Sequence, residues 1–381
     1  MIKTIRNARI VTADSEFTGS VEVDGAVFGE LAHGNSGLFG LAGEDWRGDY
    51  LLPGMVELHT DNLEKHLMPR PKVSWPALPA IIAHDAQIAA SGITTVLDAI
   101  SVGDLDADSL RTQTMISCIE GLRQAGGAGI LRADHFLHLR LELAEQNLLG
   151  WFEPYVDDDS LKLVSLMDHT PGQRQWTDIS HYRVYVSGKR GWSEEKVDGM
   201  LEGLLHRQQV YAAANRRDVV DLCNRRRHPI PLATHDDTTL EHVIEGVANG
   251  VSLSEFPTTL LAARAAHEHG LGIIMGAPNM VRGGSHSGNV SAAELARAGL
   301  VDALSSDYVP ASLLHAAFVL LREGYDLPRA IATVTRNPAQ MVGLTDRGEI
   351  AQGLRADYIR VRVVQDIPVV MGVWKAGLQI A

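Results

Sequence analysis

Cysteine, long apolar runs and basic charge are all scarce in this sequence. The two cysteines, Cys118 and Cys223, lie far apart without CxxC spacing, so we interpret both as small buried hydrophobic residues and not as a disulfide or a metal pair. No basic segment followed by an apolar core opens the chain, and no apolar run reaches the ~18 residues of a membrane helix. These absences predict a cytoplasmic protein in a reducing compartment.

The charge balance excludes two classes of partner. Lysine and arginine number 34 against 47 aspartates and glutamates, which gives a formal net charge of -13, and no basic block is present. We therefore expect neither nucleic-acid binding nor attachment to an anionic membrane. A small anionic ligand remains compatible with this charge, provided that basic residues converge locally.

The middle of the chain alternates between strand-like and helix-like segments. Its apolar runs are Tyr50–Leu58, Ile93–Ala99, His135–Leu141, Leu161–Met167, Ile230–Thr234, Val251–Glu255, Gly272–Met275 and Ala303–Ser306. The helix-like segments include Ala77–Ala90, Asp108–Gln124, Glu194–Arg227, Thr239–Ala248 and Ala292–Ala298. Eight strands alternating with helices predict an α/β fold, and the count favours a closed (β/α)8 TIM-type barrel.

Both ends of the chain contain short β-like runs. These are Ile2–Ala8, Ile10–Ala13, Ser20–Val23, Gly348–Ile350, Asp357–Val364 and Val369–Gln379. Because these runs flank the long middle, we expect one small β-sandwich module built from both termini. The predicted domains are this composite module, residues 1–52 and 345–381, and the barrel, residues 53–344.

Polar residues follow most of the predicted strands, where a barrel carries its catalytic groups. They are His59 and Asp61 after the first run, Glu142 after the third, Asp168 and His169 after the fourth, His235, Asp236 and Asp237 after the fifth, Glu255 after the sixth and Asp307 after the eighth. Imidazole and carboxylate ligands suit zinc, manganese or iron. The pattern predicts a metal site, whereas His84 and Asp85, in the middle of a predicted helix, are more typical of a structural role.

Several longer motifs carry a family resemblance. HTDNLEKH, SGITTVLDA, MDHTPGQRQ, ATHDD, EFPTT, VRGGSHSGN and LSSDYVPASLL occur in order between Leu51 and Leu344. Together they resemble the phosphonate-metabolism branch of the amidohydrolase superfamily. The resemblance implies a metal-dependent hydrolase of the carbon–phosphorus lyase pathway. The implied reaction converts alpha-D-ribose 1-methylphosphonate 5-triphosphate into ribose 1-methylphosphonate 5-phosphate and pyrophosphate.

The resemblance also implies roles for the strand-end residues. His59 and Asp61 become a metal pair, His235 becomes a catalytic metal ligand, and Asp307 binds metal and shuttles a proton. Many members of the superfamily use a modified lysine on the fourth strand as the bridging ligand. Here Lys162 opens that strand and points to its wrong end. The bridging ligand therefore stays open between Glu142, Asp168, His169 and Glu255. The expected metal ligands are His59, Asp61, Glu142, His169, His235 and Asp307. They would hold one or two divalent ions: zinc first, with manganese or iron as alternatives.

A triphosphate needs local positive charge and an activated nucleophile. The residues expected to bind substrate are Arg70, Lys72, Arg140, Arg174, Asp236, Arg282, Ser285 and His286. Because neutral water attacks an anionic phosphate poorly, the metal's expected role is to lower the pKa of water from ~16 toward ~7. Hydroxide would then attack the phosphorus nearest the ribose, with Asp307 accepting the proton.

Two other functions share this fold. One is hydrolysis of a cyclic amide or deamination of a ring, which leaves the arginines unexplained. The other is a barrel protein without activity, which leaves the four strand-end residues His59, Asp61, His235 and Asp307 unexplained. A homodimer and association with enzymes of the carbon–phosphorus lyase pathway follow from the resemblance alone.

Overall fold

The structure, a computed structural model, describes residues 2–34, 43–70, 73–104, 111–172, 174, 194–285 and 288–381. Residues 1–98, 118–136 and 275–381 form one compact unit, and residues 99–117 and 137–274 form a second. Each unit is described by itself below. Within the described ranges, no helix is long and apolar enough to cross a membrane.

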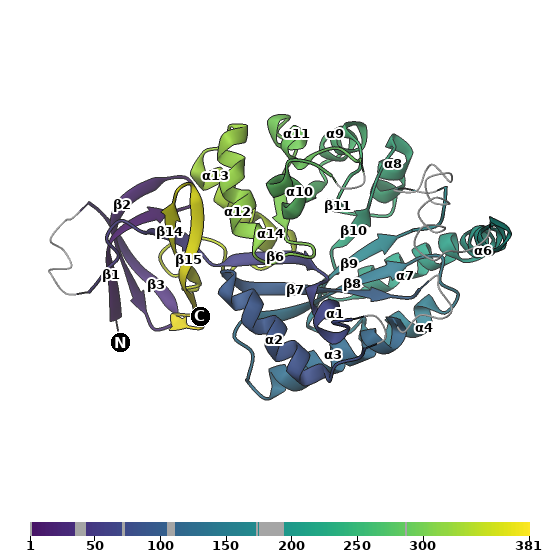
Figure 1. The fold of residues 1–381 in the computed structure, drawn as a ribbon, viewed down its shortest axis with the longest axis horizontal. Helices are drawn as coiled ribbons and strands as arrows, with labels where there is room; N and C mark the ends of the chain where they lie inside the picture. The colour runs from purple at the N-terminus through teal and green to yellow at the C-terminus, as the bar shows by residue number, and fades with distance from the viewer. Residues whose placement is uncertain are drawn as a thin grey trace. The chain divides into compact units, whose positions relative to one another are not determined.

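Eight parallel strands follow one another in chain order in a single sheet (Figure 1). They are β6 (Met55–Thr60), β7 (Ile93–Val102), β8 (Asp134–Glu142), β9 (Leu161–Met167), β10 (Leu232–His235), β11 (Leu253–Glu255), β12 (Gly272–Gly276) and β13 (Ala303–Ser305). A parallel bridge between Thr60 and Asp307 joins the ends of β6 and β13. The first and last strands are thus bonded to one another, which confirms the predicted (β/α)8 barrel.

Helices separate most of these strands. They are α1 (Asn62–Leu67), α2 (Ala77–Ala90), α3 (Arg111–Gly127), α4 (Leu148–Phe152), α6 (Glu194–Arg207), α7 (Ala213–Arg225), α8 (Leu240–Ala248), α9 (Leu260–Glu268), α10 (Ala277–Arg282), α11 (Ala292–Arg297), α12 (Ser312–Val319), α13 (Leu327–Ala332) and α14 (Arg336–Met341). A π-helical turn at Gln208–Ala212 connects α6 to α7, so the predicted helix over 194–227 forms almost as expected. Cys118 and Cys223 are buried and free, as predicted.

The sequence forms these elements for identifiable local reasons. All six residues of β6 and all ten of β7 are buried, as expected for parallel strands covered on both faces. Helices α8 and α9 each begin after a threonine. Thr239 and Thr259 accept a hydrogen bond from the backbone N–H three residues later, which satisfies a donor that the first helical turn leaves unpaired.

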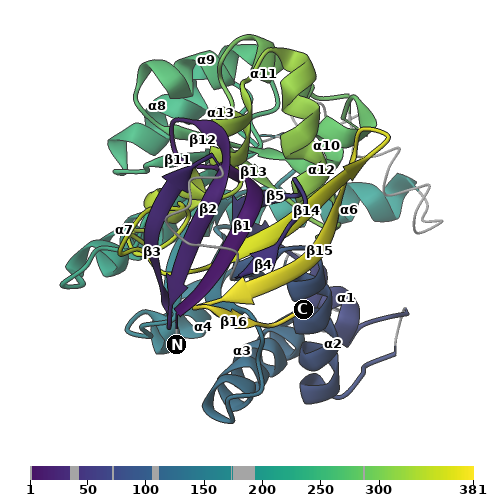
Figure 2. The same ribbon diagram turned by 90° about the vertical axis from the view of Figure 1, so that its left-hand side faces the viewer.

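The terminal segments form a second sheet, drawn in purple and yellow in Figure 2. Its strands are β1 (Ile2–Val11), β2 (Glu16–Asp24), β3 (Val27–His33), β4 (Glu44–Asp45), β5 (Tyr50–Pro53), β14 (Tyr358–Val364), β15 (Ile367–Lys375) and β16 (Leu378–Gln379). The order β16-β15-β14-β5-β1-β2-β3, with β4 paired to β1, places C-terminal strands beside N-terminal ones. The predicted β module from both termini is thereby confirmed, while its exact boundaries at residues 52 and 345 stay a prediction.

Aromatic side chains form much of the core of this sheet. The rings of Tyr358 and Trp374 stack with their centroids 4.9 Å apart, and Trp46 lies 5.6 Å from Trp374. Trp46 and Tyr358 are fully buried. Such rings bury a large apolar area at a small cost in side-chain entropy, so few of them suffice for a small module.

Several details of the strand prediction are wrong. The run Tyr50–Leu58 is two strands, because the chain leaves the terminal sheet after β5 and enters the barrel at β6. Gly54 lies at this junction, and an added Cβ there would stand 2.4 Å from the Thr94 hydroxyl. Ile2–Ala8 and Ile10–Ala13 form one bulged strand, and Gly348–Ile350 is not a strand.

A fully buried polar network lies in the first unit. His84 Nε2 and His135 Nδ1 each lie 2.7 Å from one oxygen of Asp98, and His135 Nε2 lies 3.3 Å from Asp85. Because carboxylates face both nitrogens of His135, this ring must carry both protons to donate to both. His84 Nδ1 instead accepts from the Asn62 amide, 3.0 Å away, which makes His84 neutral. The structural role predicted for His84 and Asp85 fits this arrangement.

The charge on His135 should make the protein less stable at alkaline pH. Burial opposes protonation, but Asp98 and Asp85 outweigh it and raise the pKa of His135 to about 9. The stabilisation is therefore complete below the unfolded pKa of ~6.5 and disappears as the pH rises toward 9, a loss of roughly 3 kcal/mol. We expect the thermal midpoint to fall over this range in wild type and much less in His135→Gln.

The exposed His267 on α9 provides the control for this prediction. His267→Gln should keep the wild-type pH dependence, measured by thermal unfolding at pH 6 to 10. Parallel curves for wild type and His135→Gln would show that His135 carries no charge in the folded protein.

Candidate metal centre

In the first unit, three predicted site residues meet where β6 joins β13. The backbone N–H of Asp307 donates to the carbonyl of His59, at 3.0 Å, and the N–H of Asp61 donates to the carbonyl of Asp307, at 3.2 Å. His59 is buried and Asp307 is half-buried. The closure of the barrel therefore fixes the backbones of His59, Asp61 and Asp307 together.

A buried carboxylate on β6 holds this junction. Glu57 accepts hydrogen bonds from the N–H groups of His59 and Ser306, both at 2.7 Å, and from the Ser305 hydroxyl at 2.9 Å. Burial raises the pKa of Glu57, although these hydrogen bonds oppose the rise. The side chain thus connects β6 to β13 at the two strands that carry His59 and Asp307.

In the second unit, His169 and Glu142 form a close pair. Glu142 is the last residue of β8, and its carboxylate lies 2.7 Å from His169 Nδ1 and accepts from the His169 N–H at 3.2 Å. Burial would lower the pKa of His169, but the Glu142 carboxylate outweighs burial and raises it. The hydrogen bond at Nδ1 fixes the ring and leaves Nε2 as the atom able to bind a metal.

His235, the last residue of β10, lies among groups from neighbouring strands. Its Nδ1 is 3.4 Å from the carboxylate of Glu255, which also accepts from the Ser165 hydroxyl. His138 Nε2 lies 2.6 Å from the same hydroxyl. Burial lowers the pKa of His235, and neutral imidazole is the form that binds metals.

Three side chains of the second unit could hold a divalent ion together. The possible ligand atoms of three residues, one each from His169, His235 and Asp236, all lie within 4.8 Å of one another. The two imidazole rings meet edge to face, with their centroids 5.8 Å apart. Two imidazoles and a carboxylate fit zinc, manganese or iron. Asp236, predicted from sequence to bind substrate, thus lies with the candidate ligands. Asp168 does not belong to this group of three, and its carboxylate accepts from the Gln208 amide at 3.3 Å.

The backbone is strained at the first or second residue after three of the barrel strands. Asp236, Phe256 and Asp307 adopt left-handed conformations, with φ of 57°, 54° and 53°. The N–H of each donates to a neighbouring strand: Asp236 to Glu255, Phe256 to Ile274, and Asp307 to His59. Left-handed residues other than glycine are uncommon and concentrate at functional sites, where surrounding bonds hold them in place.

The predicted basic residues separate into different environments. Arg140, on β8, has a buried Nε atom without a hydrogen-bond partner among the described residues, and its charge opposes protonation of both His169 and His235. Arg70 and Arg282 are exposed, and Ser285 is half-buried. The two remaining residues of the predicted set, Lys72 and His286, lie outside the described residues.

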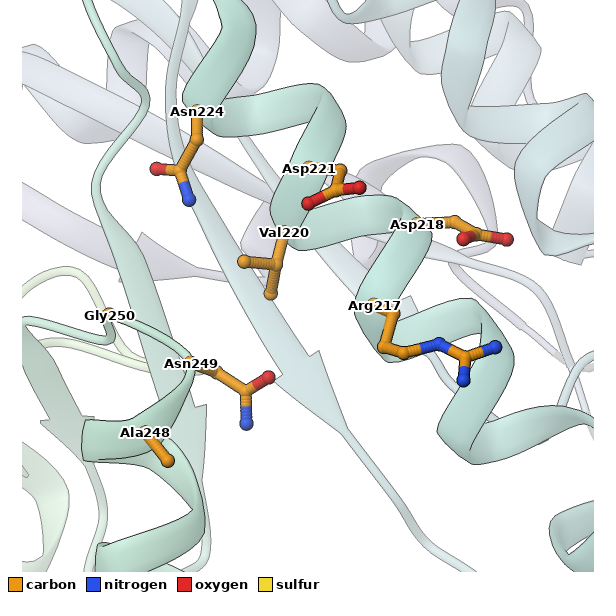
Figure 3. Close-up of a pocket in the computed structure, with 8 residues that line it drawn as sticks. All are labelled: Arg217, Asp218, Val220, Asp221, Asn224, Ala248, Asn249 and Gly250. Atoms are coloured by element: carbon orange, nitrogen blue, oxygen red, sulfur yellow. The ribbon is translucent and has the colours of Figure 1, made fainter.

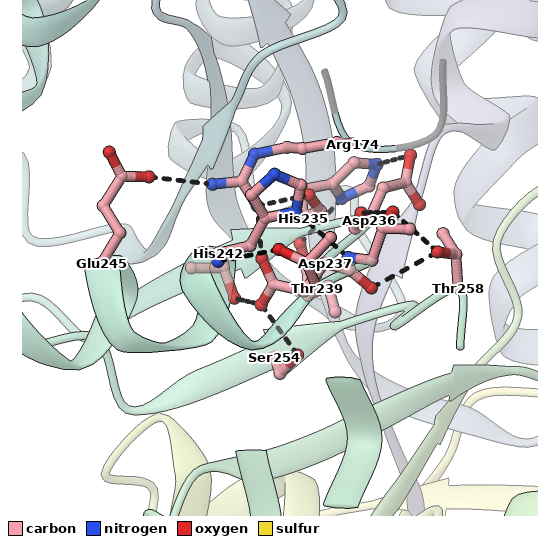
Figure 4. A network of polar contacts seen from close by, with 12 residues as sticks. Arg174, His235, Asp236, Asp237, Thr239, His242, Glu245, Ser254 and Thr258 are labelled. Atoms are coloured by element: carbon pink, nitrogen blue, oxygen red, sulfur yellow. Dashed lines mark hydrogen bonds and ion pairs between the residues drawn. The ribbon is translucent and has the colours of Figure 1, made fainter. Parts of the chain in front are cut away.

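Arg174 occupies a different position from the one expected. It is 3% exposed, its Nη1 donates to the His235 carbonyl at 3.1 Å, and the same nitrogen bonds the Asp237 carboxylate. Figure 4 shows this guanidinium among side chains of the β10–α8 connection. Protein groups therefore occupy Nη1, whereas Nη2 has no hydrogen-bond partner among the described residues and lies 3.5 Å from the Glu245 carboxylate.

Comparison with known proteins identifies the family. The chain is 44% identical over 379 residues to the alpha-D-ribose 1-methylphosphonate 5-triphosphate diphosphatase of Escherichia coli (strain K12), covering 99% of each protein. The chain belongs to this diphosphatase family. A model of the amidohydrolase family also matches residues 188–370, which agrees with the superfamily expected from the motifs.

Solved structures share the fold of this family member. Dihydropyrimidinase from Brevibacillus agri NCHU1002 matches with a TM-score of 0.64 at 14% identity, over 100% of this chain and 95% of that one. N-acetylglucosamine-6-phosphate deacetylase from Pasteurella multocida matches with a TM-score of 0.64 at 12% identity, over 100% and 99%. At such low identity these matches establish the barrel and the additional β module, and nothing about the substrate.

Three functional candidates of this diphosphatase-family chain are absent from the set predicted by sequence. Glu57 had a usable signal, since an acidic residue inside an apolar strand must find buried partners. Ser165 had none, because a serine in a buried strand is common. Asp237 was one of three polar residues after the fifth strand, and only the turn at Asp236 decides which way it points.

A surface groove lies apart from this chemistry. It has a volume of about 410 Å³ and is lined by residues of α7 and of the end of α8, among them Arg217, Asp221 and Asn249 (Figure 3). None of its lining residues belongs to the candidate site.

Proposed function

We propose that this chain hydrolyses alpha-D-ribose 1-methylphosphonate 5-triphosphate to ribose 1-methylphosphonate 5-phosphate and pyrophosphate, in phosphonate catabolism. The observation that carries the proposal is the 44% identity to the Escherichia coli diphosphatase across 99% of both chains. The His–Glu pair at His169 and the unpaired Arg140 Nε support it, because they suit a metal and an anionic ligand. A cytoplasmic location, a homodimer and association with other enzymes of the pathway are further parts of this proposal.

The metal ligands we propose follow barrel strands at their carboxyl ends, where barrel enzymes carry their catalytic groups. His169, His235 and Asp236 come from one unit, and His59, Asp61 and Asp307 come from the other. Glu142, which the resemblance implied as a metal ligand, has the proposed role of fixing the His169 ring, because its carboxylate lies 2.7 Å from His169 Nδ1. A bound divalent ion supplies Lewis acidity, which makes water more acidic and stabilises charge on phosphate oxygens. Zinc is the first candidate, followed by manganese and iron, with one or two ions.

The side chains of the protein have separate tasks in the reaction. The half-buried Asp307 carboxylate accepts the proton of the attacking water, and the Glu57 junction holds its backbone in place. Arg140 donates to oxygens of the departing pyrophosphate, where negative charge increases in the transition state. The bond that forms joins water oxygen to the phosphorus nearest the ribose, and the bond that breaks releases pyrophosphate.

The first experiment measures metal content and pyrophosphate release by the purified protein. We expect release from the ribose triphosphate, loss of activity after treatment with a chelator, and recovery when zinc or manganese is returned. ATP tests how strictly the ribose phosphonate is recognised, and a hydantoin tests the cyclic-amide alternative. Hydrolysis of the hydantoin with no pyrophosphate from any triphosphate would transfer the assignment to amide hydrolysis. Absence of both metal and activity would support a non-catalytic barrel.

A further inference from the structure

Asp237 is a fully buried carboxylate with several partners in the β10–α8 connection. One of its oxygens bonds the Arg174 guanidinium, and the other accepts from the Thr234 hydroxyl and, at 3.2 Å, from the Ser254 hydroxyl. Its own carbonyl accepts from the Thr258 N–H at 2.8 Å. A charge at 0% exposure is tolerated only when paired and hydrogen-bonded, so this arrangement constrains Asp237 on all sides.

The partners of Asp237 lie on the face of the strands that points away from His235. Thr234 precedes His235 in β10, and successive strand residues point to opposite faces. The Thr234 methyl group accordingly faces Gly246 of α8, where an added Cβ would stand 2.7 Å away. Arg174 reaches the same helix, with Nη2 3.5 Å from Glu245. The Asp237–Arg174 pair therefore lies on the helix side of β10.

This pair controls the backbone that carries two of the proposed metal ligands. Arg174 Nη1 bonds both Asp237 and the His235 carbonyl, so the peptide after His235 is held directly (Figure 4). The next residue, Asp236, has a φ of 57° and donates its N–H to Glu255. A left-handed residue between two anchored neighbours has little freedom to turn its side chain elsewhere.

We propose that Asp237 and Arg174 are positioning residues, which orient His235 and Asp236 toward the metal. The inference rests on the proposed function for the identity of the ligands. It replaces the substrate-binding role that the sequence suggested for Arg174. Supporting groups of this kind affect metal affinity and turnover together, since a ligand that drifts by a fraction of an ångström binds the ion less well.

The test compares Asp237→Asn, Arg174→Gln and the double variant in two assays. The first is zinc affinity, measured by competition with a chromogenic chelator, and the second is steady-state pyrophosphate release. We expect each single variant to lose roughly 10- to 100-fold in zinc affinity and in kcat, with KM changed little. The double variant should be no worse than the more impaired single one, because both act through one contact. Arg174→Lys should recover part of the loss.

A matched control lies in the same unit. Asp221 and Arg225 form an exposed ion pair on α7, so Asp221→Asn and Arg225→Gln remove the same charges without touching the site. Both should match wild type. A higher KM for Arg174→Gln with unchanged zinc affinity would overturn the proposal and return Arg174 to substrate binding. A lower thermal midpoint with wild-type zinc affinity and kcat would also overturn it. The zinc-affinity assay tests the positioning role of Asp237 and Arg174 even if the wild-type protein releases no pyrophosphate.

Discussion

Asp307→Asn should lower kcat for pyrophosphate release by about a thousand-fold. The amide has nearly the same shape as the carboxylate but cannot accept a proton from water. It also removes one negative charge from the proposed ligands. The backbone of Asp307 bonds His59 and Asp61 through its N–H and carbonyl, and these bonds do not involve the side chain. The protein should therefore fold normally while losing activity, as measured by circular dichroism and by a pyrophosphate assay.

Asp366→Asn is the matched control for this change. Asp366 lies in the turn between β14 and β15 with a φ of 64°, a conformation that asparagine tolerates well. The control removes the same charge in the terminal sheet, and its kcat should equal that of wild type. An Asp307→Asn protein with more than a tenth of wild-type kcat would exclude Asp307 as the proton acceptor.

Arg140→Ala should lower kcat/KM for the triphosphate by roughly 100-fold, the value of a charge-assisted hydrogen bond to an anion in a shielded site. The physical reason is the buried Nε of Arg140, which has no partner among the described residues and needs an acceptor. Inhibition by the product pyrophosphate should weaken in parallel. Arg140→Lys should recover only part of the loss, because lysine lacks the planar fork of arginine.

Arg264 on α9 is exposed, and Arg264→Ala serves as the control for loss of one positive charge. Wild-type kinetics are expected for it at all salt concentrations. If Arg140→Ala instead kept its kcat/KM and its pyrophosphate inhibition, the guanidinium would have only a structural role on β8.

The strand prediction succeeded because burial on both faces is visible in composition. Runs such as Ile93–Ala99 are rich in apolar and β-branched residues, and β7 is buried along its whole length. A polar residue follows most of these runs at the strand end, and for this reason His59, His235 and Asp307 were selected as candidates. The long motifs between Leu51 and Leu344 placed the chain in its superfamily, and the 44% identity to the diphosphatase confirms it.

Contacts between residues far apart in the chain could not be predicted from the sequence. The network around Asp98 joins His84 on α2 to His135 on β8, and no local pattern indicates that these three side chains meet. The same holds for Glu57 with Ser306, which are 249 residues apart. The Glu57–Ser306 contact depends on closure of the barrel, because only the closed sheet brings its first and last strands together.

The sequence by itself determined the barrel, the terminal β module and the residue types at the strand ends, since these follow from periodicity, burial and local motifs. Only the tertiary structure separated the roles of the three consecutive residues at the end of β10. His235 and Asp236 belong to the candidate metal centre, whereas Asp237 is bonded to Arg174, Thr234 and Ser254. The reason is physical: the left-handed turn at Asp236 and the buried charge of Arg174 set these directions, and both depend on hydrogen bonds to other strands and segments.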